Sequence, residues 1–161
     1  MSASKGDHPD VIMLPPFIFL IALFVAIGLD FTNTLNFLPP AFSATSWTFY
    51  LGLALLVAAL ALGVSALRTF RKVGTNPSPH EPTLKLATTG PYRLSRNPMY
   101  IGFMMILAGL SLVASLEWGL ILVPVLAVLL HYGVVTREEA YLSAKFGQPY
   151  REFMNRTRRW I

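Results

Sequence analysis

Cysteine is absent from the sequence, and charged residues make up only 13% of its 161 positions. The lack of cysteine excludes disulfide bonds, thiol nucleophiles and cysteine-ligated metal sites. About a quarter of the residues in an ordinary soluble domain are charged, so this chain has too few for a surface that faces water on all sides. Hydrophobic residues reach 54% of the chain, and we therefore expect lipid to cover much of the protein.

The signature motifs of several common soluble enzymes are also missing. The chain has no G-x-G-x-x-G, no P-loop and no H-E-x-x-H, and no alternation of strand and helix patterns. Soluble dinucleotide-binding folds and soluble methyltransferase folds are thereby excluded. The histidines His8, His80 and His131 are far apart in the sequence, so we predict no metal site.

Four apolar stretches predict an all-α integral membrane protein with about four transmembrane helices. They cover residues 11–29, 47–67, 99–116 and 118–135. Each stretch is close to the roughly 20 residues that cross a bilayer, and the last two are slightly short. Only a tight turn around Glu117 separates these two, so we expect them to form a helical hairpin. Residues 1–161 are interpreted as one membrane domain, with the first two helices within residues 11–67.

The basic residues predict how these helices are oriented. They are concentrated in residues 68–98 and 136–161 and are absent from residues 30–46. Because basic loops remain in the cytoplasm, we expect both termini at the cytoplasmic face of a multi-pass protein. The formal net charge of +5 then favours anionic lipid headgroups, and not nucleic acid, as a partner. The polar first ten residues and the lack of a convincing cleavage site predict a retained first helix, not a signal peptide.

Two regions outside the predicted spans have distinctive patterns. Residues 71–98 are rich in proline, which prevents a continuous helix, and they are more numerous than a plain connection requires. We expect this loop to line a site. After residue 135, apolar residues recur at helical spacing until Gly147, and Pro149 suits the first turn of a new helix. This pattern predicts two short amphipathic helices at the membrane interface.

The first candidate for chemistry is the segment 89–102, which leads into the third span. Asn97 is expected to cap that helix, with Pro98 at its first position. A helix start with interfacial anchors would explain these residues and Arg96 equally well. It would not explain Gly102, where the missing side chain lets a helix or a ligand approach the backbone.

The second candidate is the acidic pair that follows the last span. Glu138 and Glu139 either offset nearby basic residues or hold a cationic ligand, because an unpaired carboxylate beside an apolar helix is costly. His131 precedes Glu138 by seven residues, which places both on one face of an α-helix. His131 is then either a site residue or a hydrogen-bonding partner of a neighbouring helix. The terminal residues 156–161 are expected to bind headgroups, with one arginine turned inward toward an anionic group.

These segments together resemble the isoprenylcysteine carboxyl methyltransferase and phospholipid methyltransferase superfamily. The resemblance covers about residues 71–161. It is carried by residues 74–76, 86–93 and 95–102, by the basic terminus, and by Glu138, Glu139, Leu142, Phe146, Gly147 and Tyr150. It implies that residues 68–161 form a catalytic core that binds S-adenosyl-L-methionine at the cytoplasmic face. The methyl acceptor would be lipophilic or lipid-linked. Many members have histidine where this chain has Asn97, which forms hydrogen bonds but carries no charge.

The resemblance also implies roles for individual residues. In the family, the stretch that matches Arg96 to Gly102 and the paired acids contact the cofactor. The implied cofactor-binding residues are Tyr92, Arg96, Asn97, Pro98, Tyr100, Gly102, Glu138 and Glu139. Methyl transfer to a carboxylate needs no base, and Arg158 or Arg159 could orient that acceptor. Transfer to an amine releases a proton, which Glu138, Glu139 or His131 could accept.

Two other functions fit parts of the pattern. A relative of the membrane sterol reductases would use NADPH, although the chain is short for that group and lacks the extra helices expected of it. A non-catalytic membrane scaffold or small transporter subunit is the other alternative. Charged residues are nearly absent from the predicted spans, which argues against ion-coupled transport.

Overall fold

The computed structural model describes residues 7–33, 35–78 and 81–161, and within these ranges every regular element is helical. The all-α class is therefore confirmed. His80 and the first six residues of the predicted domain lie outside the described residues. In chain order the elements are α1 (Pro15–Thr32), α2 (Trp47–Val73), the 3₁₀ turn η1 (Gly90–Arg93), α3 (Pro98–Ala114), α4 (Glu117–Leu130), the π-helical turn η2 (His131–Val135), α5 (Thr136–Phe146) and α6 (Gln148–Arg156).

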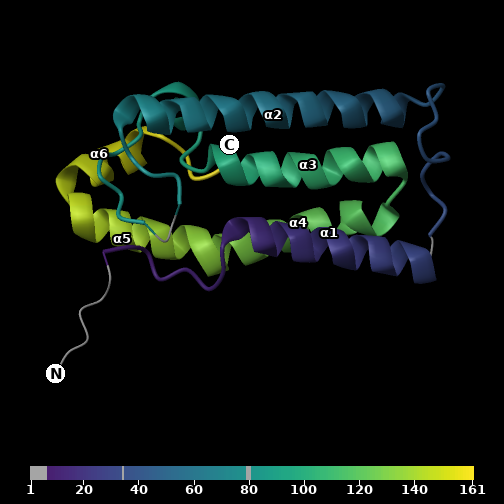
Figure 1. The fold of residues 1–161 in the computed structure, drawn as a ribbon, viewed down its shortest axis with the longest axis horizontal. Coiled ribbons are helices and arrows are strands. Elements are labelled where there is room, and N and C mark those ends of the chain that lie inside the picture. The colour runs from purple at the N-terminus through teal and green to yellow at the C-terminus, as the bar shows by residue number, and fades with distance from the viewer. Residues whose placement is uncertain (1–6, 34, 79–80) are drawn as a thin grey trace.

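Three helical segments of the described chain are long and apolar enough to cross a membrane. They are α1, α2 and the joined segment Glu117–Phe146, while α3 is apolar but shorter. These elements run alongside one another in Figure 1, with α3 and α4 forming the expected hairpin. The protein is therefore a multi-pass membrane protein.

The last span differs from its expected form. The sequence pattern placed its end at residue 135 and a separate interfacial helix after it, whereas α4, η2 and α5 form one continuous helical segment. The reason is that no residue between 130 and 146 stops helical hydrogen bonding. The first interruption is Gly147, whose φ of 58° ends α5. Pro149 then lies in the first turn of α6, as predicted.

Glycines allow α2 and α3 to pack with their backbones in contact. A Cβ atom on Gly52 would lie 2.7 Å from the carbonyl oxygen of Gly109, and one on Gly109 would lie 2.9 Å from that of Gly52. Any larger residue at either position would separate the helices, because real Cβ atoms do not approach so closely. This contact fixes the position of α3, whose first turn forms part of the site described below.

A buried acid, Glu117, stabilises the end of the bundle where α1 ends and α4 begins. Glu117 is only 1% exposed, and its carboxylate accepts backbone N–H groups of the α1–α2 link at 2.7–2.9 Å. The donors are Leu35, Asn36 and Leu38. Asp30 in turn accepts the backbone N–H groups of Glu117 and Trp118 at 3.1 and 3.2 Å. The sequence patterns assigned Glu117 only to a turn, and the structure shows that it joins α1, the link and α4.

Replacing Glu117 with glutamine is expected to lower the free energy of unfolding by about 3 kcal/mol. The substitution removes the charge that strengthens several backbone hydrogen bonds, each worth about 1.5–3 kcal/mol, and turns an amide N–H₂ toward other donors. The measurement is the midpoint of thermal unfolding in detergent. The exposed Glu152 of α6 supplies the matched control, Glu152→Gln, and equal midpoints for both variants would contradict the role of Glu117.

Candidate functional site

A pocket lies where the α2–α3 loop meets α5 and α6. Figure 1 shows these elements together at one end of the bundle. The pocket encloses about 810 Å³ of empty space, counting the space at its open mouth. The loop lines one side of it from Asn76 to Asn97, α3 contributes its first turn, and α5 and α6 form the opposite side. The proline-rich segment therefore lines a cavity, as its length and composition suggested.

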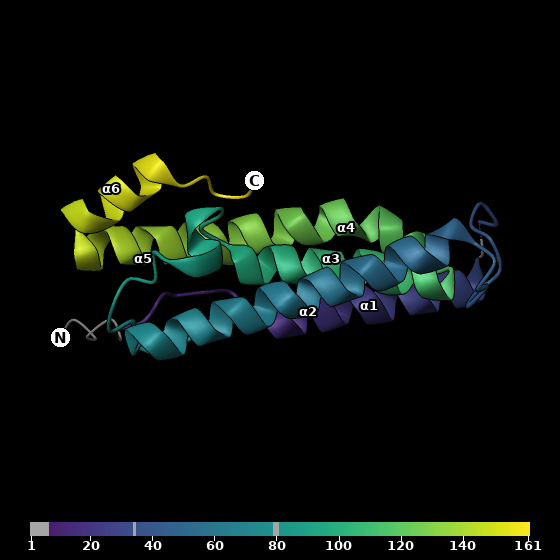
Figure 2. The same cartoon turned by 90° about the horizontal axis from the view of Figure 1, so that it is seen from above.

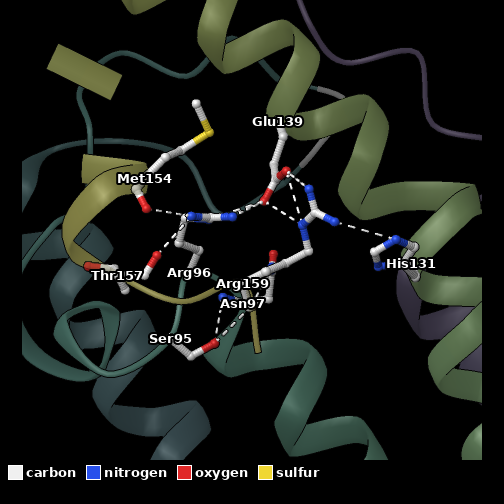
Figure 3. Close-up of polar contacts among 8 residues, drawn as sticks. All are labelled: Ser95, Arg96, Asn97, His131, Glu139, Met154, Thr157 and Arg159. Carbon is white, nitrogen blue, oxygen red and sulfur yellow. Dashed lines mark hydrogen bonds and ion pairs between the residues drawn. The ribbon is translucent and has the colours of Figure 1, made fainter. Parts of the chain in front are cut away.

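Glu139 lies between two arginines that come from distant parts of the chain (Figure 3). Its carboxylate is 3.0 Å from a terminal nitrogen of Arg96, which precedes α3, and 2.7 Å from one of Arg159, which follows α6. The Nε atoms of both arginines also donate to this carboxylate at 3.1 Å. The side chains of Arg96 and Glu139 are each only 11% exposed. Such paired, charge-assisted bonds hold the loop, α5 and the C-terminal tail together.

The residues that precede α3 bind the tail through further hydrogen bonds. Arg96 donates from Nη1 to the carbonyl oxygens of Met154 and Thr157, at 2.9 and 2.8 Å. Its backbone N–H donates to the carbonyl oxygen of Arg158 at 2.9 Å. Figure 1 and Figure 2 show the consequence, since α6 runs back along α5 and the tail that follows it ends beside the start of α3. Arg96 thus holds the end of α6 and the tail in position through these hydrogen bonds.

Asn97 differs from its expected role as a helix cap. It stands at the cap position of α3, with Pro98 in the first turn, but its side chain makes no capping hydrogen bond. Instead its Nδ2 group donates to the carbonyl oxygen of Arg159 at 2.8 Å, and the Ser95 hydroxyl donates to the same oxygen at 3.2 Å. The side chain of the buried Asn97 thus binds the returning tail.

Glu138 has a different environment from its neighbour. Its carboxylate lines the pocket and accepts the Tyr100 hydroxyl at 2.6 Å. Within the described part of the chain, no lysine or arginine nitrogen lies within 4.0 Å of it. Adjacent carboxylates therefore have distinct surroundings: Glu139 is bound by two cations, and Glu138 faces the cavity with only a phenol as partner.

Two further tyrosines, Tyr92 and Tyr150, line the same pocket. Tyr92, in η1, is 7% exposed and packs edge-on against Phe70 of α2 with ring centroids 5.3 Å apart. Tyr150, in α6, is 2% exposed. Burial raises the pKa of both phenols above the ordinary value, and the nearby glutamates add to the effect. Both hydroxyls therefore stay protonated, and both rings present apolar surface to the cavity. Tyr150 was not among the residues assigned a role from the sequence.

His131 lies outside the pocket wall but reaches the same network. Its Nε2 atom is 3.5 Å from Nη1 of Arg159, the arginine that binds Glu139. The prediction that His131 and Glu138 share one helix face assumed an uninterrupted α-helix. The chain instead has the π-helical turn η2 here, whose wider i→i+5 turn contains an extra residue and changes the register of α5.

Four residues given a possible site role from the sequence do not line the pocket as the structure describes it: Gly102, His131, Arg158 and Arg159. Gly102 faces α2, because a Cβ atom there would lie 3.8 Å from the carbonyl oxygen of Ala59. The side chain of Arg158 is exposed, whereas that of Arg159 turns inward. The other residues assigned from the sequence all line the pocket, namely Tyr92, Arg96, Asn97, Pro98, Tyr100, Glu138 and Glu139.

The segment before α1 contributes to the site in a way that no sequence signal indicated. Pro9 lines the pocket. Nζ of Lys145 donates to Asp7 at 2.6 Å, and the hydroxyl of Tyr141 donates to Asp7 at 3.0 Å. Tyr141 also lines the pocket and accepts the backbone N–H of Thr83 at 3.3 Å. Contacts between residues far apart in the sequence thus join the first described segment, the loop and α5.

Comparisons with known proteins test whether the chain belongs to a known family. The model of the phospholipid methyltransferase family matches residues 47–149, which is well over half of the chain. An uncharacterised protein of Haemophilus influenzae is 35% identical over 65 residues, which cover 39% of this chain and 100% of that protein. No solved structure matches the chain. The family match includes α2, the pocket loop, the hairpin and both glutamates, and the chain therefore belongs to the phospholipid methyltransferase family.

Proposed function

We propose that this protein is a membrane methyltransferase that uses S-adenosyl-L-methionine to methylate a lipophilic or lipid-linked acceptor. The observation that carries the proposal is the contrast between the two glutamates. Glu139 is bound by two arginines, while the carboxylate of Glu138 faces a pocket without a described cationic partner. A carboxylate in that position is costly unless a cationic ligand or a proton compensates it.

The residues of the pocket fit the proposed cofactor. S-adenosyl-L-methionine carries an ammonium group, a sulfonium and a carboxylate, and when bound it supplies an electrophilic methyl group. Glu138 complements the ammonium group through a charge-assisted hydrogen bond. The rings of Tyr92, Tyr100 and Tyr150 offer apolar faces, which attract both a flat base and a cation. No group of three or more metal-binding side chains occurs among the described residues, and the proposed reaction requires none.

Methyl transfer is an in-line displacement, so the chain must orient the reactants and exclude water. Burial of Tyr92 and Tyr150 supports both tasks. A carboxylate acceptor would need no base, whereas an amine must lose a proton as its bond to the methyl carbon forms. Glu138 is the pocket carboxylate not engaged by arginine, so it either binds the cofactor's ammonium group or accepts that proton.

The placement of basic residues supports a cytoplasmic active site. The end of α2, the loop, α5 and α6 carry most of the lysines and arginines, and all lie at the pocket end in Figure 1. The opposite end contains the link that Glu117 holds, and residues 35–46 contain no basic residue. By the positive-inside rule the pocket end faces the cytoplasm. The cofactor would then enter from water, while a lipid acceptor would enter from the bilayer.

The test is calorimetric binding of S-adenosylhomocysteine to the purified protein in detergent. We expect saturable binding at one site per chain, and no heat from NADPH under the same conditions. The Glu152→Gln variant, altered on an exposed face of α6, should bind as the unaltered protein does. Absence of binding by protein that unfolds cooperatively on heating would overturn the proposal, and binding of NADPH alone would favour the reductase alternative.

A further inference from the structure

The segment that precedes α1, residues 7–12, runs beside α5 in Figure 1 and is bound once per turn of the last helical segment. The carbonyl oxygen of Gly133 accepts the backbone N–H of Ile12 at 3.1 Å. Arg137 donates from Nη1 to the carbonyl oxygen of Asp10 at 2.8 Å. The next contacts come from helix positions 141 and 145, which bind Asp7. Since four-residue spacing places side chains on one face of a helix, the segment pairs in order with successive turns of one helix face.

The side chains of this segment alternate between the interior and the surface. Pro9 is buried and lines the pocket that contains Glu138. Val11 is 8% exposed and belongs to the apolar core that α1, α3 and α4 form. Asp10 and Ile12 are exposed. Alternation of this kind is typical of an extended chain with one side against the protein. The segment therefore covers part of the pocket with Pro9 and is fixed beside it by Val11.

The two ends of the segment are held with different strength. Val11 is held by burial of its apolar side chain, which only loss of the helix packing would reverse. Asp7 is held by Nζ of Lys145 at 2.6 Å and by the hydroxyl of Tyr141 at 3.0 Å. The Lys145 and Asp7 side chains are 24% and 59% exposed, and ion pairs in contact with water contribute little to stability. The Asp7 end can therefore separate from α5 while Val11 stays in place.

The side of the pocket that this segment covers has a polar outer surface. Asp7, His8 and Asp10 are exposed, whereas the large exposed side chains of α1 are apolar. A charged ligand that comes from water would pass this segment and not the apolar face of α1. Tyr141 connects the segment to the loop, because its hydroxyl donates to Asp7 and accepts the backbone N–H of Thr83 at 3.3 Å. Separation of Asp7 thus breaks one connection across the pocket.

We propose that residues 7–10 form a strap that opens and closes the pocket toward water. Val11 is its fixed end, and the contact of Asp7 with Lys145 and Tyr141 is its releasable end. The strap closes over the bound ligand, and its opening controls the rates of cofactor entry and product release. The identity of that ligand rests on the proposed function. The strap itself lies outside residues 47–149, the part that matches the family model.

The first measurement follows the opening of the strap without any ligand. The chain contains no cysteine, so Pro9→Cys introduces a single thiol at a buried position of the strap. Its reaction rate with N-ethylmaleimide is measured by mass spectrometry of the intact protein. Adding Asp7→Ala should raise that rate about 5-fold, as expected for the loss of an exposed ion pair and its hydrogen bonds. Exchanging the charges, with Asp7→Lys and Lys145→Asp together, should restore a slow rate that neither change alone gives.

Asp10→Ala is the matched control for Asp7→Ala. It removes the same charge from the same segment, but the described contact of Asp10 with Arg137 uses the backbone carbonyl oxygen and is retained. The second measurement is the dissociation rate of radiolabelled S-adenosylhomocysteine in detergent, with Pro9 in place. Asp7→Ala should raise this rate about 5-fold, and Asp10→Ala should leave it unchanged.

The outcomes separate this inference from the function on which it rests. Equal thiol reaction rates after adding Asp7→Ala or Asp10→Ala would overturn the strap. A faster thiol reaction with an unchanged dissociation rate would also overturn it, because the strap would then open without controlling the pocket. Protein that binds no S-adenosylhomocysteine would remove the proposed function, while the thiol rates would still decide whether the strap opens. Should Pro9→Cys fold poorly, the dissociation rates decide, because they are measured with Pro9 in place.

Discussion

Replacing Glu139 with alanine is expected to abolish S-adenosylhomocysteine binding and to lower the free energy of unfolding by about 3–5 kcal/mol. The substitution leaves Arg96, whose side chain is 11% exposed, without its anionic partner. Removing one member of a buried ion pair is costly because the remaining charge is uncompensated. Arg159 is 38% exposed, so water would screen its charge and it would add little to the loss. Without Glu139, the pre-α3 segment and the tail would both lose their ion pairs with α5.

The measurements are thermal unfolding and calorimetric titration in the same detergent. Arg158→Ala is the matched control, because this exposed neighbour of Arg159 lies outside the pocket and should leave both quantities nearly unchanged. Arg96→Lys should behave more like Glu139→Ala than like the unaltered protein. Lysine retains the charge but lacks the planar group with which Arg96 binds a carboxylate and two carbonyl oxygens at once. Normal stability of Glu139→Ala would contradict the role assigned to the ion-pair network.

Replacing Glu138 with glutamine is expected to weaken S-adenosylhomocysteine binding about 10- to 100-fold while leaving stability almost unchanged. The loss corresponds to a charge-assisted hydrogen bond of about 1.5–3 kcal/mol. Glutamine retains an oxygen that can accept the Tyr100 hydroxyl, and no ion pair with a described basic residue is broken. The control is Tyr100→Phe, which removes the hydroxyl but keeps the ring and the charge of Glu138, and should weaken binding less.

The same variant distinguishes the two roles proposed for Glu138. If it binds the cofactor's ammonium group, the dissociation constant rises and the rate of methyl transfer at saturating cofactor changes little. If it accepts a proton from an amine acceptor, affinity is retained and that rate falls. A variant with normal affinity and a normal rate would show that Glu138 has neither role.

Local chemistry allowed several features to be predicted from the sequence. Long apolar stretches identified the four helices, because the bilayer requires about 20 apolar residues per crossing. Prolines predicted that residues 71–98 do not form one continuous helix, and Gly147 with Pro149 predicted the break between α5 and α6. Each of these features depends on a residue's own backbone preferences or on its neighbours in the chain, so the sequence was sufficient.

The hydrogen-bond and ion-pair partners of polar side chains could not be predicted from local sequence patterns. Glu138 and Glu139 are adjacent and chemically identical, yet the nearest cations to Glu139 come from positions 43 and 20 residues away. The cap expected of Asn97 was replaced by a bond to a tail that lies 62 residues later in the chain. Spacing in the sequence also could not predict the helix register beyond His131. The π-helical turn changes that register, although the apolar pattern around it is that of an ordinary helix.

The sequence by itself determined that this protein is helical, that it crosses the membrane several times, and that its polar and basic segments gather outside the spans. Hydrophobicity, proline and glycine act locally, and their effects can be read along the chain. Only the tertiary structure decided which glutamate is bound by arginine and which faces the cavity, and how Glu117 joins distant backbone segments. The physical reason is that charge pairing depends on distance in space, which the folding of α3, α5 and the tail against one another establishes.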